Sequence, residues 1–130
     1  MDDRFKKGYM KNFIEELMSN NFKNVYKNEN LSKYNWFNLG GPAEILFKPE
    51  DSSQLSSFLK FVRGKNQTIN VLGAGSNTLI RDAGIEGITI KLGPKFSYLN
   101  LLKGDVVEVG AATLDKKLSD FASNHSLSGF

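Results

Sequence analysis

The residues best suited to chemistry lie in the segment 71–82, which reads Val-Leu-Gly-Ala-Gly-Ser-Asn-Thr-Leu-Ile-Arg-Asp. Two glycines and a Ser-Asn pair directly follow a short apolar run, residues 69–72, which is typical of a buried strand. A strand that ends on glycines leaves main-chain N–H groups unobstructed by side chains, and successive N–H groups form a concave nest for anions, phosphates above all. Ser76 and Asn77 add side-chain donors there. The sequence therefore predicts a phosphate-binding loop.

Two common phosphate motifs do not match this loop. A Walker loop requires a lysine after its last glycine, whereas Ser76 follows Gly75. A dinucleotide fingerprint of the Rossmann type requires a third glycine where this chain has Thr78. The remaining Gly-x-Gly-Ser-Asn pattern is less general, so a plain turn without a ligand stays an alternative. Arg81 and Asp82 are expected to form a surface pair.

Two further segments could contribute to a pocket. The turn Gly40–Pro42 precedes a predicted strand, and turn geometry alone is the favoured interpretation. Residues 35–38 next to it could line a pocket, although Trp36 suits a partly buried core position equally well. Gly110 and Ala111 end a later strand, where small side chains would let a flat ring approach the main chain.

No set of side chains suited to acid–base, nucleophilic or metal chemistry can be assembled from this sequence. The chain has no cysteine, which excludes disulfides and thiolate metal sites, and its single histidine cannot form a zinc site alone. His125 is expected at a helix end, where the helix dipole stabilises a surface imidazole. Glu15 and Glu16 are expected on the exposed face of a helix. We therefore predict a ligand-binding chain with no catalytic residue and no metal.

Composition bounds the class of protein. A length of 130 residues predicts one domain, and 40% hydrophobic and 24% charged residues are typical of soluble globular proteins. The net charge of +3 comes from 17 basic and 14 acidic residues without a long basic run, which argues against nucleic acid as a partner. No apolar run approaches a membrane span, and the amino terminus lacks the apolar core of a signal peptide. These features predict a cytoplasmic protein with no membrane partner.

Three helices are predicted. The first covers residues 8–21, with an apolar face at helical spacing that comprises Met10, Phe13, Ile14, Leu17 and Met18. A second begins after Asp51, with Gln54 in the capping-box position, and ends at Gly64. Its apolar face comprises Leu55, Phe58, Leu59 and Val62. A third helix, capped by Thr113, buries Leu114, Leu118, Phe121 and Ala122.

The predicted strands place the phosphate loop in an α+β fold. Residues 43–49 and 69–72 flank the second helix, which implies a right-handed parallel βαβ unit. Residues 87–92 predict a further strand, and residues 96–109 a hairpin with a glycine-containing turn. The polar residues 23–33 are predicted to form a plain connection. Parallel strands first and a hairpin later indicate the α+β class.

Four stretches together carry a resemblance to a known family. Residues 34–43, 71–82, 87–90 and 109–130 occur in the order and spacing of the amino-terminal part of UDP-N-acetylenolpyruvoylglucosamine reductases, the MurB-type flavoenzymes of peptidoglycan precursor synthesis. The resemblance covers roughly residues 30–130. The Leu-Gly-x-Gly-Ser-Asn core combined with the Gly-Gly-Pro-Ala turn is specific, whereas either piece alone is not.

The resemblance implies an FAD-binding domain of the para-cresol methylhydroxylase (PCMH) type, in which the loop 73–77 holds the FAD pyrophosphate. Members of this family reduce the enolpyruvyl double bond of a UDP-sugar with NADPH through the flavin. The positions that match the family's FAD contacts are Leu72, Gly73, Ala74, Gly75, Ser76, Asn77, Asn38, Gly40, Gly110 and Ala111. Relatives often carry a threonine near Phe37 and Asn38, so the sequence departs from the family there.

The resemblance also implies that the chain is a truncated, catalytically incomplete form. Hydride delivery to an enolpyruvyl group requires a cation and a proton donor, and the family's groups lie beyond Phe130. The expected division is a helix and connection over residues 1–29 and an incomplete PCMH-type domain over residues 30–130. A second chain could supply the missing half. The alternatives are a non-catalytic flavin- or nucleotide-binding module, an inert gene remnant, or a subunit of a sugar or hydroxy-acid oxidase.

Overall fold

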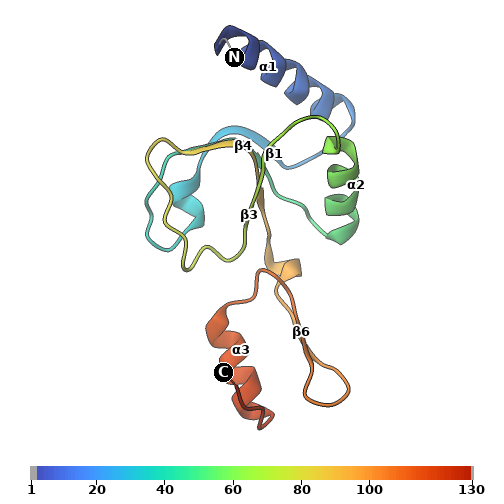
Figure 1. Cartoon of the computed structure of the whole chain (residues 1–130), viewed down its shortest axis with the longest axis vertical. Coiled ribbons are helices and arrows are strands. Elements are labelled where there is room, and N and C mark those ends of the chain that lie inside the picture. Colours follow the sequence, from blue (N-terminus) through green and yellow to red (C-terminus); the bar gives the residue numbers. More distant parts are fainter. Residues whose placement is uncertain (1–2, 130) are drawn as a thin grey trace.

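The computed structural model describes residues 3–129, in which a four-stranded sheet with two helices is joined to a smaller lobe (Figure 1). Residues 1, 2 and 130, which fall inside the expected domain ranges, lie outside the described residues. The elements in chain order are α1 (Asp3–Ser19), β1 (Val25–Asn30), η1 (Leu31–Tyr34), β2 (Pro42–Phe47), α2 (Ser52–Val62), β3 (Ile69–Leu72), β4 (Ile85–Lys91), η2 (Pro94–Phe96), β5 (Leu99–Leu101), β6 (Val107–Val109) and α3 (Asp115–Asn124).

The sheet has the strand order β1-β2-β4-β3. Strands β2, β4 and β3 run parallel, and β1 pairs with β2 in the antiparallel sense. The predicted parallel β2–α2–β3 unit and the α+β class are therefore confirmed. Because β4 lies between β2 and β3, the two strands of this unit do not pair with each other.

The prediction of a plain connection over residues 23–33 is wrong, because β1 and η1 occupy it. Strand β1 pairs with β2 from Val25 opposite Phe47 to Asn30 opposite Pro42. Its sequence, Val-Tyr-Lys-Asn-Glu-Asn, has few strand-favouring residues, so pairing with a distant strand decides its conformation rather than local preference.

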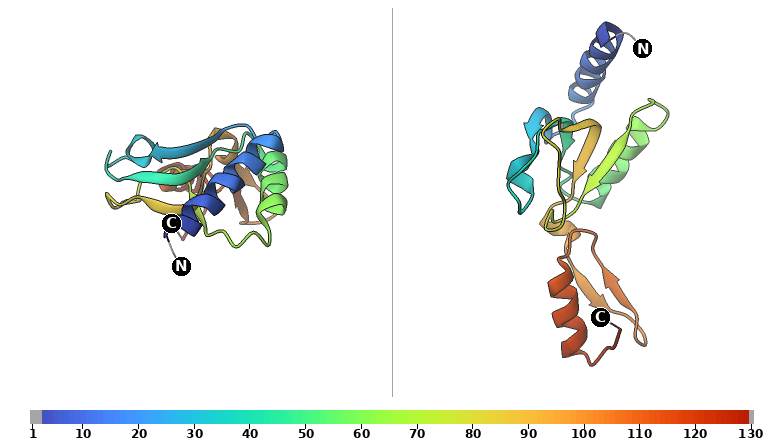
Figure 2. Two further views of the ribbon diagram at one scale, coloured as in Figure 1. Left: turned by 90° about the horizontal axis from the view of Figure 1, so that it is seen from above. Right: turned by 60° about the vertical axis from the view of Figure 1, so that its left-hand side comes forward.

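The main core lies between the sheet and the two helices (Figure 2). Phe47 of β2 and Phe58 of α2 are fully buried and stacked, with ring centroids 3.8 Å apart, and Phe22 meets both rings edge-on. Two residues assigned to the apolar helix faces are exposed, Met18 by 64% and Leu59 by 39%. Those faces are narrower than predicted, because Met18 and Leu59 each follow a buried residue and point about 100° away from it.

The predicted ends of α2 are confirmed. The carboxylate of Asp51 accepts a hydrogen bond from the main-chain N–H of Gln54 at 2.8 Å, while the Gln54 side chain accepts one from the N–H of Glu50 at 2.7 Å. Gly64 follows the helix with a φ of +79°, a conformation that glycine adopts without strain.

Strand β3, which leads into the candidate phosphate loop, is an edge strand. The prediction of a buried strand is wrong, since Ile69 is 40% exposed and Val71 65% exposed. Leu72 is buried on the other face of the sheet, in a second cluster with Leu31, Ala43, Leu46 and Ile80. The loop therefore begins from a strand that is anchored by one side chain at its end.

The predicted hairpin and last helix form the smaller lobe, at the opposite end of the molecule from α1 (Figures 1 and 2). The prediction that Thr113 caps α3 is wrong: Leu114 holds that position without a side-chain cap, and the Thr113 hydroxyl donates to the Tyr98 carbonyl at 3.2 Å. Of the predicted buried face of α3, Ala122 is buried, whereas Leu114, Leu118 and Phe121 are half-buried.

Candidate functional site

The loop after β3 presents a row of unused main-chain donors. Two of its carbonyls accept hydrogen bonds from other segments: Gly73 accepts one from the Lys91 ammonium, and Gly75 accepts one from the N–H of Trp36 at 3.0 Å. In contrast, the N–H groups of residues 73–77 donate to no acceptor within the part of the chain that the structure describes. Successive free N–H groups beside a residue with a φ of +76°, Gly75, are the arrangement of an anion-binding nest.

Both loop glycines lie against main chain from other elements. A Cβ atom at Gly75 would lie 2.2 Å from the Tyr34 carbonyl oxygen, and one at Gly73 would lie 2.8 Å from the Ala111 carbonyl oxygen. The glycines thus serve close packing within the chain as well as leaving the N–H groups bare.

The structure places the other expected ligand contacts in two positions. Ala111 lies beside Gly73, so the loop and the residues after β6 do come together, and Gly110 is buried against the Phe96 carbonyl oxygen. Asn38 is exposed in the turn before β2, and Gly40 lies against Ile80 at the far end of the loop segment. These two residues adopt positive φ values, 52° and 113°, as turn geometry requires.

The residues near this turn have different roles. Asn35 is buried, and its amide donates to the carbonyls of Leu31 at 2.9 Å and Leu39 at 2.8 Å, which closes the turn. Trp36 is 66% exposed, so its alternative interpretation as a partly buried core residue is wrong. Arg81 and Asp82 are both exposed, as expected of surface residues.

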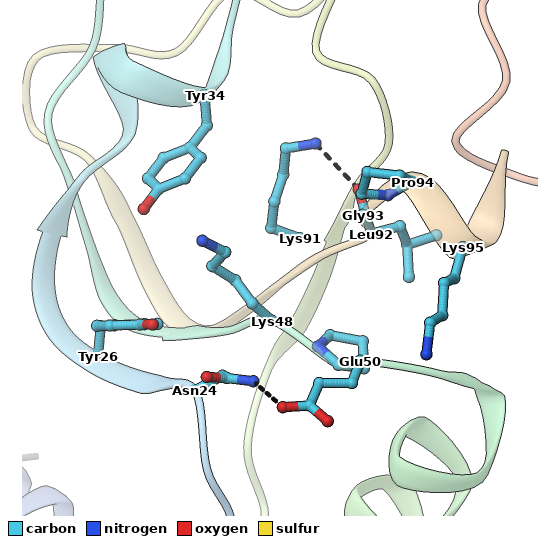
Figure 3. Close-up of a pocket in the computed structure, with 11 residues that line it drawn as sticks. Asn24, Tyr26, Tyr34, Lys48, Glu50, Lys91, Leu92, Gly93, Pro94 and Lys95 are labelled. Atoms are coloured by element: carbon cyan, nitrogen blue, oxygen red, sulfur yellow. Dashed lines mark hydrogen bonds between the residues drawn. The ribbon is translucent and has the colours of Figure 1, made fainter.

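A cavity of about 610 Å³ lies beside the loop, and sequence reasoning did not identify it (Figure 3). It is lined in part by Tyr26 of β1, Tyr34 of η1, and two lysines that end the central parallel strands, Lys48 after β2 and Lys91 of β4. The Lys48 Nζ atom lies 5.6 Å from the Tyr26 ring centroid and 5.3 Å from the Tyr34 ring centroid. The only sequence signal that could have indicated this cavity is a single lysine at the end of each of two apolar strands.

The charged groups around this cavity perturb one another. Burial, and then the charge of Lys48, hold the pKa of Lys91 below its usual value. The hydroxyl of Tyr34 donates to the Glu29 carboxylate at 3.0 Å, which, with a hydrogen bond from Lys33, lowers the pKa of Glu29. Burial and the same hydrogen bond raise the pKa of Tyr34. The side chains of Lys48 and Lys91 thus line one open cavity.

Comparison with known sequences identifies the fold that carries this loop. The sequence matches the family described as FAD binding domain over residues 43–129, which include β2, α2, β3, the loop, β4 and the smaller lobe. The chain belongs to this family. This assignment agrees with the resemblance seen in the sequence.

Relatives of this FAD binding domain include reductases of greater length. It is 50% identical to UDP-N-acetylenolpyruvoylglucosamine reductase of Pelagibacter ubique over 77% of this chain and 33% of that protein, and 46% identical to the enzyme of the same name from Orientia tsutsugamushi over 79% and 35%. The crystal structure of UDP-N-acetylenolpyruvylglucosamine reductase (MurB) from Thermus caldophilus matches with a TM-score of 0.54 and 33% identity, covering 81% of this chain and 34% of that one. The chain thus spans about a third of these relatives' length.

Among residues 3–129, no group of three His, Cys, Asp or Glu side chains is placed to hold a metal ion. Every helix in the same range is too short or too polar to cross a bilayer.

Replacing Tyr34 with phenylalanine is expected to raise the pKa of Glu29 toward its usual value, because the hydroxyl of Tyr34 is the largest cause of its lowering. A lowered carboxyl pKa stabilises the fold above the pKa of the unfolded chain, and this contribution is lost as pH falls through the folded pKa. The Tyr34→Phe variant should therefore be less stable than the parent at neutral pH, and the two proteins should become equally stable in acid. NMR titration of the Glu29 carboxyl carbon measures the shift, with Tyr26→Phe as the control; an unchanged Glu29 pKa would refute the assignment.

Proposed function

We propose that the loop 73–77 binds the diphosphate of FAD and that the chain forms the amino-terminal part of a UDP-N-acetylenolpyruvoylglucosamine reductase. The observation that carries this proposal is the row of unused N–H groups in a loop whose Gly73 and Gly75 carbonyls accept hydrogen bonds from Lys91 and Trp36. Membership of the FAD binding domain family and the similarity to reductases support it. The residues that would contact FAD are Leu72, Gly73, Ala74, Gly75, Ser76, Asn77, Asn38, Gly40, Gly110 and Ala111.

The residues present fit a dinucleotide. The negative charge of a diphosphate is concentrated on its phosphate oxygens. Free N–H groups in a nest can donate hydrogen bonds to these oxygens, so the loop needs no lysine. When bound, FAD supplies hydride transfer, with NADPH as the hydride donor and a UDP-sugar as the acceptor in peptidoglycan precursor synthesis. The part of this chain is to hold and orient the cofactor; we assign no catalytic residue to it. We place the protein in the cytoplasm, where NADPH and UDP-sugars are available.

A ligand series tests whether the diphosphate is what the loop binds. FAD is titrated into the 130-residue chain while the flavin fluorescence is followed, and riboflavin, which lacks phosphate, is titrated in parallel. We expect FAD to bind, ADP to displace it, and riboflavin to bind at least tenfold more weakly, since charge-assisted hydrogen bonds contribute about 1.5–3 kcal/mol each. Equal affinity for riboflavin and FAD, or failure of ADP to compete, would contradict the proposal.

A matched pair of variants locates the binding. Ser76→Ala removes a side-chain donor from the loop, and Ser119→Ala removes the same group from the exposed surface of α3. We expect only Ser76→Ala to weaken FAD binding. If both variants or neither changed the affinity, the flavin would bind elsewhere on the chain.

A further inference from the structure

Two lysines stand side by side at the carboxyl ends of the central strands. The last register pair between β2 and β4 joins Phe47 to Ile90, so Lys48 and Lys91 are the next neighbours across the two strands. Because side chains alternate along a strand, Lys48 projects on the same face as the buried Leu46. Like charges directly opposite each other destabilise a sheet unless something compensates them.

The described residues supply little compensation for this pair. The Lys48 ammonium contacts the faces of two tyrosine rings and makes no ion pair within residues 3–129. The Lys91 ammonium donates to the carbonyls of Gly73 and Leu92, which are neutral acceptors.

Nearby carboxylates are already engaged elsewhere. Glu50, which lines the cavity, accepts a hydrogen bond from the Asn24 amide at 3.1 Å (Figure 3). Glu29 accepts hydrogen bonds from Tyr34 and Lys33. The positive charge of the two strand-end lysines is thus left facing an open cavity.

We propose that this cavity is a second anion-binding site, in which Lys48 and Lys91 bind a phosphate group of a phosphorylated ligand. Lysine is a common ligand of phosphate, and a phosphate monoester carries close to two negative charges at neutral pH, which matches two ammonium groups. In open sheets with parallel strands, ligands bind outside the carboxyl ends of those strands, where both lysines lie. A volume of about 610 Å³ bounded by Tyr26 and Tyr34 holds more than a bare ion.

The cavity differs from the loop in its hydrogen-bond donors, and the proposal for the cavity does not depend on the proposal that the loop binds FAD. The loop offers main-chain N–H groups, whereas the cavity offers side-chain ammonium groups. Lys91 contacts both, because it lines the cavity and donates to the Gly73 carbonyl. The phosphate could belong to FAD itself, extending past the loop, or to a separate phosphorylated ligand.

The test uses inorganic pyrophosphate as the probe. It is titrated into the isotope-labelled 130-residue chain at low ionic strength, and the dissociation constant is taken from the amide signals of the cavity residues Asn24, Tyr26, Lys48, Gly93 and Lys95. We expect Lys48→Met to weaken this binding about tenfold or more, from the loss of one charged donor. The control Lys60→Met removes the same charge from the exposed surface of α2 and should leave it unchanged.

Three results would overturn the proposal: no shift of the cavity signals, equal affinity in Lys48→Met and the parent, or equal weakening by Lys60→Met. Lys48→Arg keeps the charge and should retain most of the affinity for pyrophosphate. If Lys48→Arg is folded but loses this affinity as Lys48→Met does, the packing of Lys48 and not its charge is responsible, and the proposal fails. Lys91→Met should weaken binding as well, with circular dichroism to verify folding, since this lysine also holds the loop.

Titration of FAD separates the two sources of the phosphate. If Lys48→Met weakens both FAD and pyrophosphate, the site holds a phosphate of the flavin dinucleotide. If FAD binds the variant as it binds the parent, the site takes a separate ligand. Should the parent bind pyrophosphate at the cavity but not FAD at all, the cavity proposal stands and the flavin proposal fails.

Discussion

Replacement of Gly75 with alanine is expected to lower the free energy of unfolding by about 3 kcal/mol or more. Two costs add at this position. A residue with a Cβ atom is strained at a φ of +76°, by about 1–2 kcal/mol. The new methyl group would also lie 2.2 Å from the Tyr34 carbonyl oxygen, a main-chain atom that can move only if the turn after η1 moves with it. Urea denaturation followed by circular dichroism measures the loss.

Gly64 provides the matched control for this prediction. It has nearly the same φ, +79°, but nothing lies within 4 Å of a Cβ atom built on it. Gly64→Ala should therefore show the conformational cost alone, about 1–2 kcal/mol. Equal losses in the two variants would mean that the contact between the loop and Tyr34 contributes nothing to stability.

The second large effect is expected from Phe58→Ala, which should cost about 3–5 kcal/mol of unfolding free energy. Phe58 is fully buried and stacked on Phe47, and Phe22 packs against its edge with ring centroids 5.4 Å apart. Removal of this ring leaves a cavity where α2 meets the sheet. The loss is a large fraction of the 5–15 kcal/mol typical of a whole domain, so thermal denaturation should show a much lower midpoint.

Leu59→Ala is the control for Phe58→Ala. The two residues are neighbours on α2, and both changes shorten an apolar side chain, but Leu59 is 39% exposed. Its loss should cost about 1 kcal/mol. A similar cost for both variants would show that the stacked rings do not carry the stability of this core.

The elements that the sequence predicted well are those with local signals. Asp51 and Gln54 cap α2 as their spacing indicates, and the Gly104 turn closes the hairpin. Strand β1 was missed because its stability comes from β2, which lies beyond η1 and a turn in the chain. The exposure of Val71 could not be read from an apolar run, since the position of β3 at the edge of the sheet depends on strand order.

The same distinction holds for the candidate sites. The loop 73–77 was identified because its glycines, serine and asparagine are contiguous. That its carbonyls are held by Lys91 and Trp36 depends on contacts between distant segments. Lys48 and Lys91 are separated by 43 positions along the sequence, and only the register of β2 with β4 makes them neighbours.

The place of β4 between β2 and β3 governs how the sheet can assemble during synthesis. Neither β2 nor β3 has its parallel neighbour until residues 85–91 have been made, although α2 between them can form as soon as it is complete. Until then the edge of β2 away from β1 and the edges of β3 keep unpaired main-chain N–H and C=O groups, which can pair with other nascent chains. Because the pairing of β4 with β2 joins segments far apart in the sequence, we expect it to form more slowly than α2.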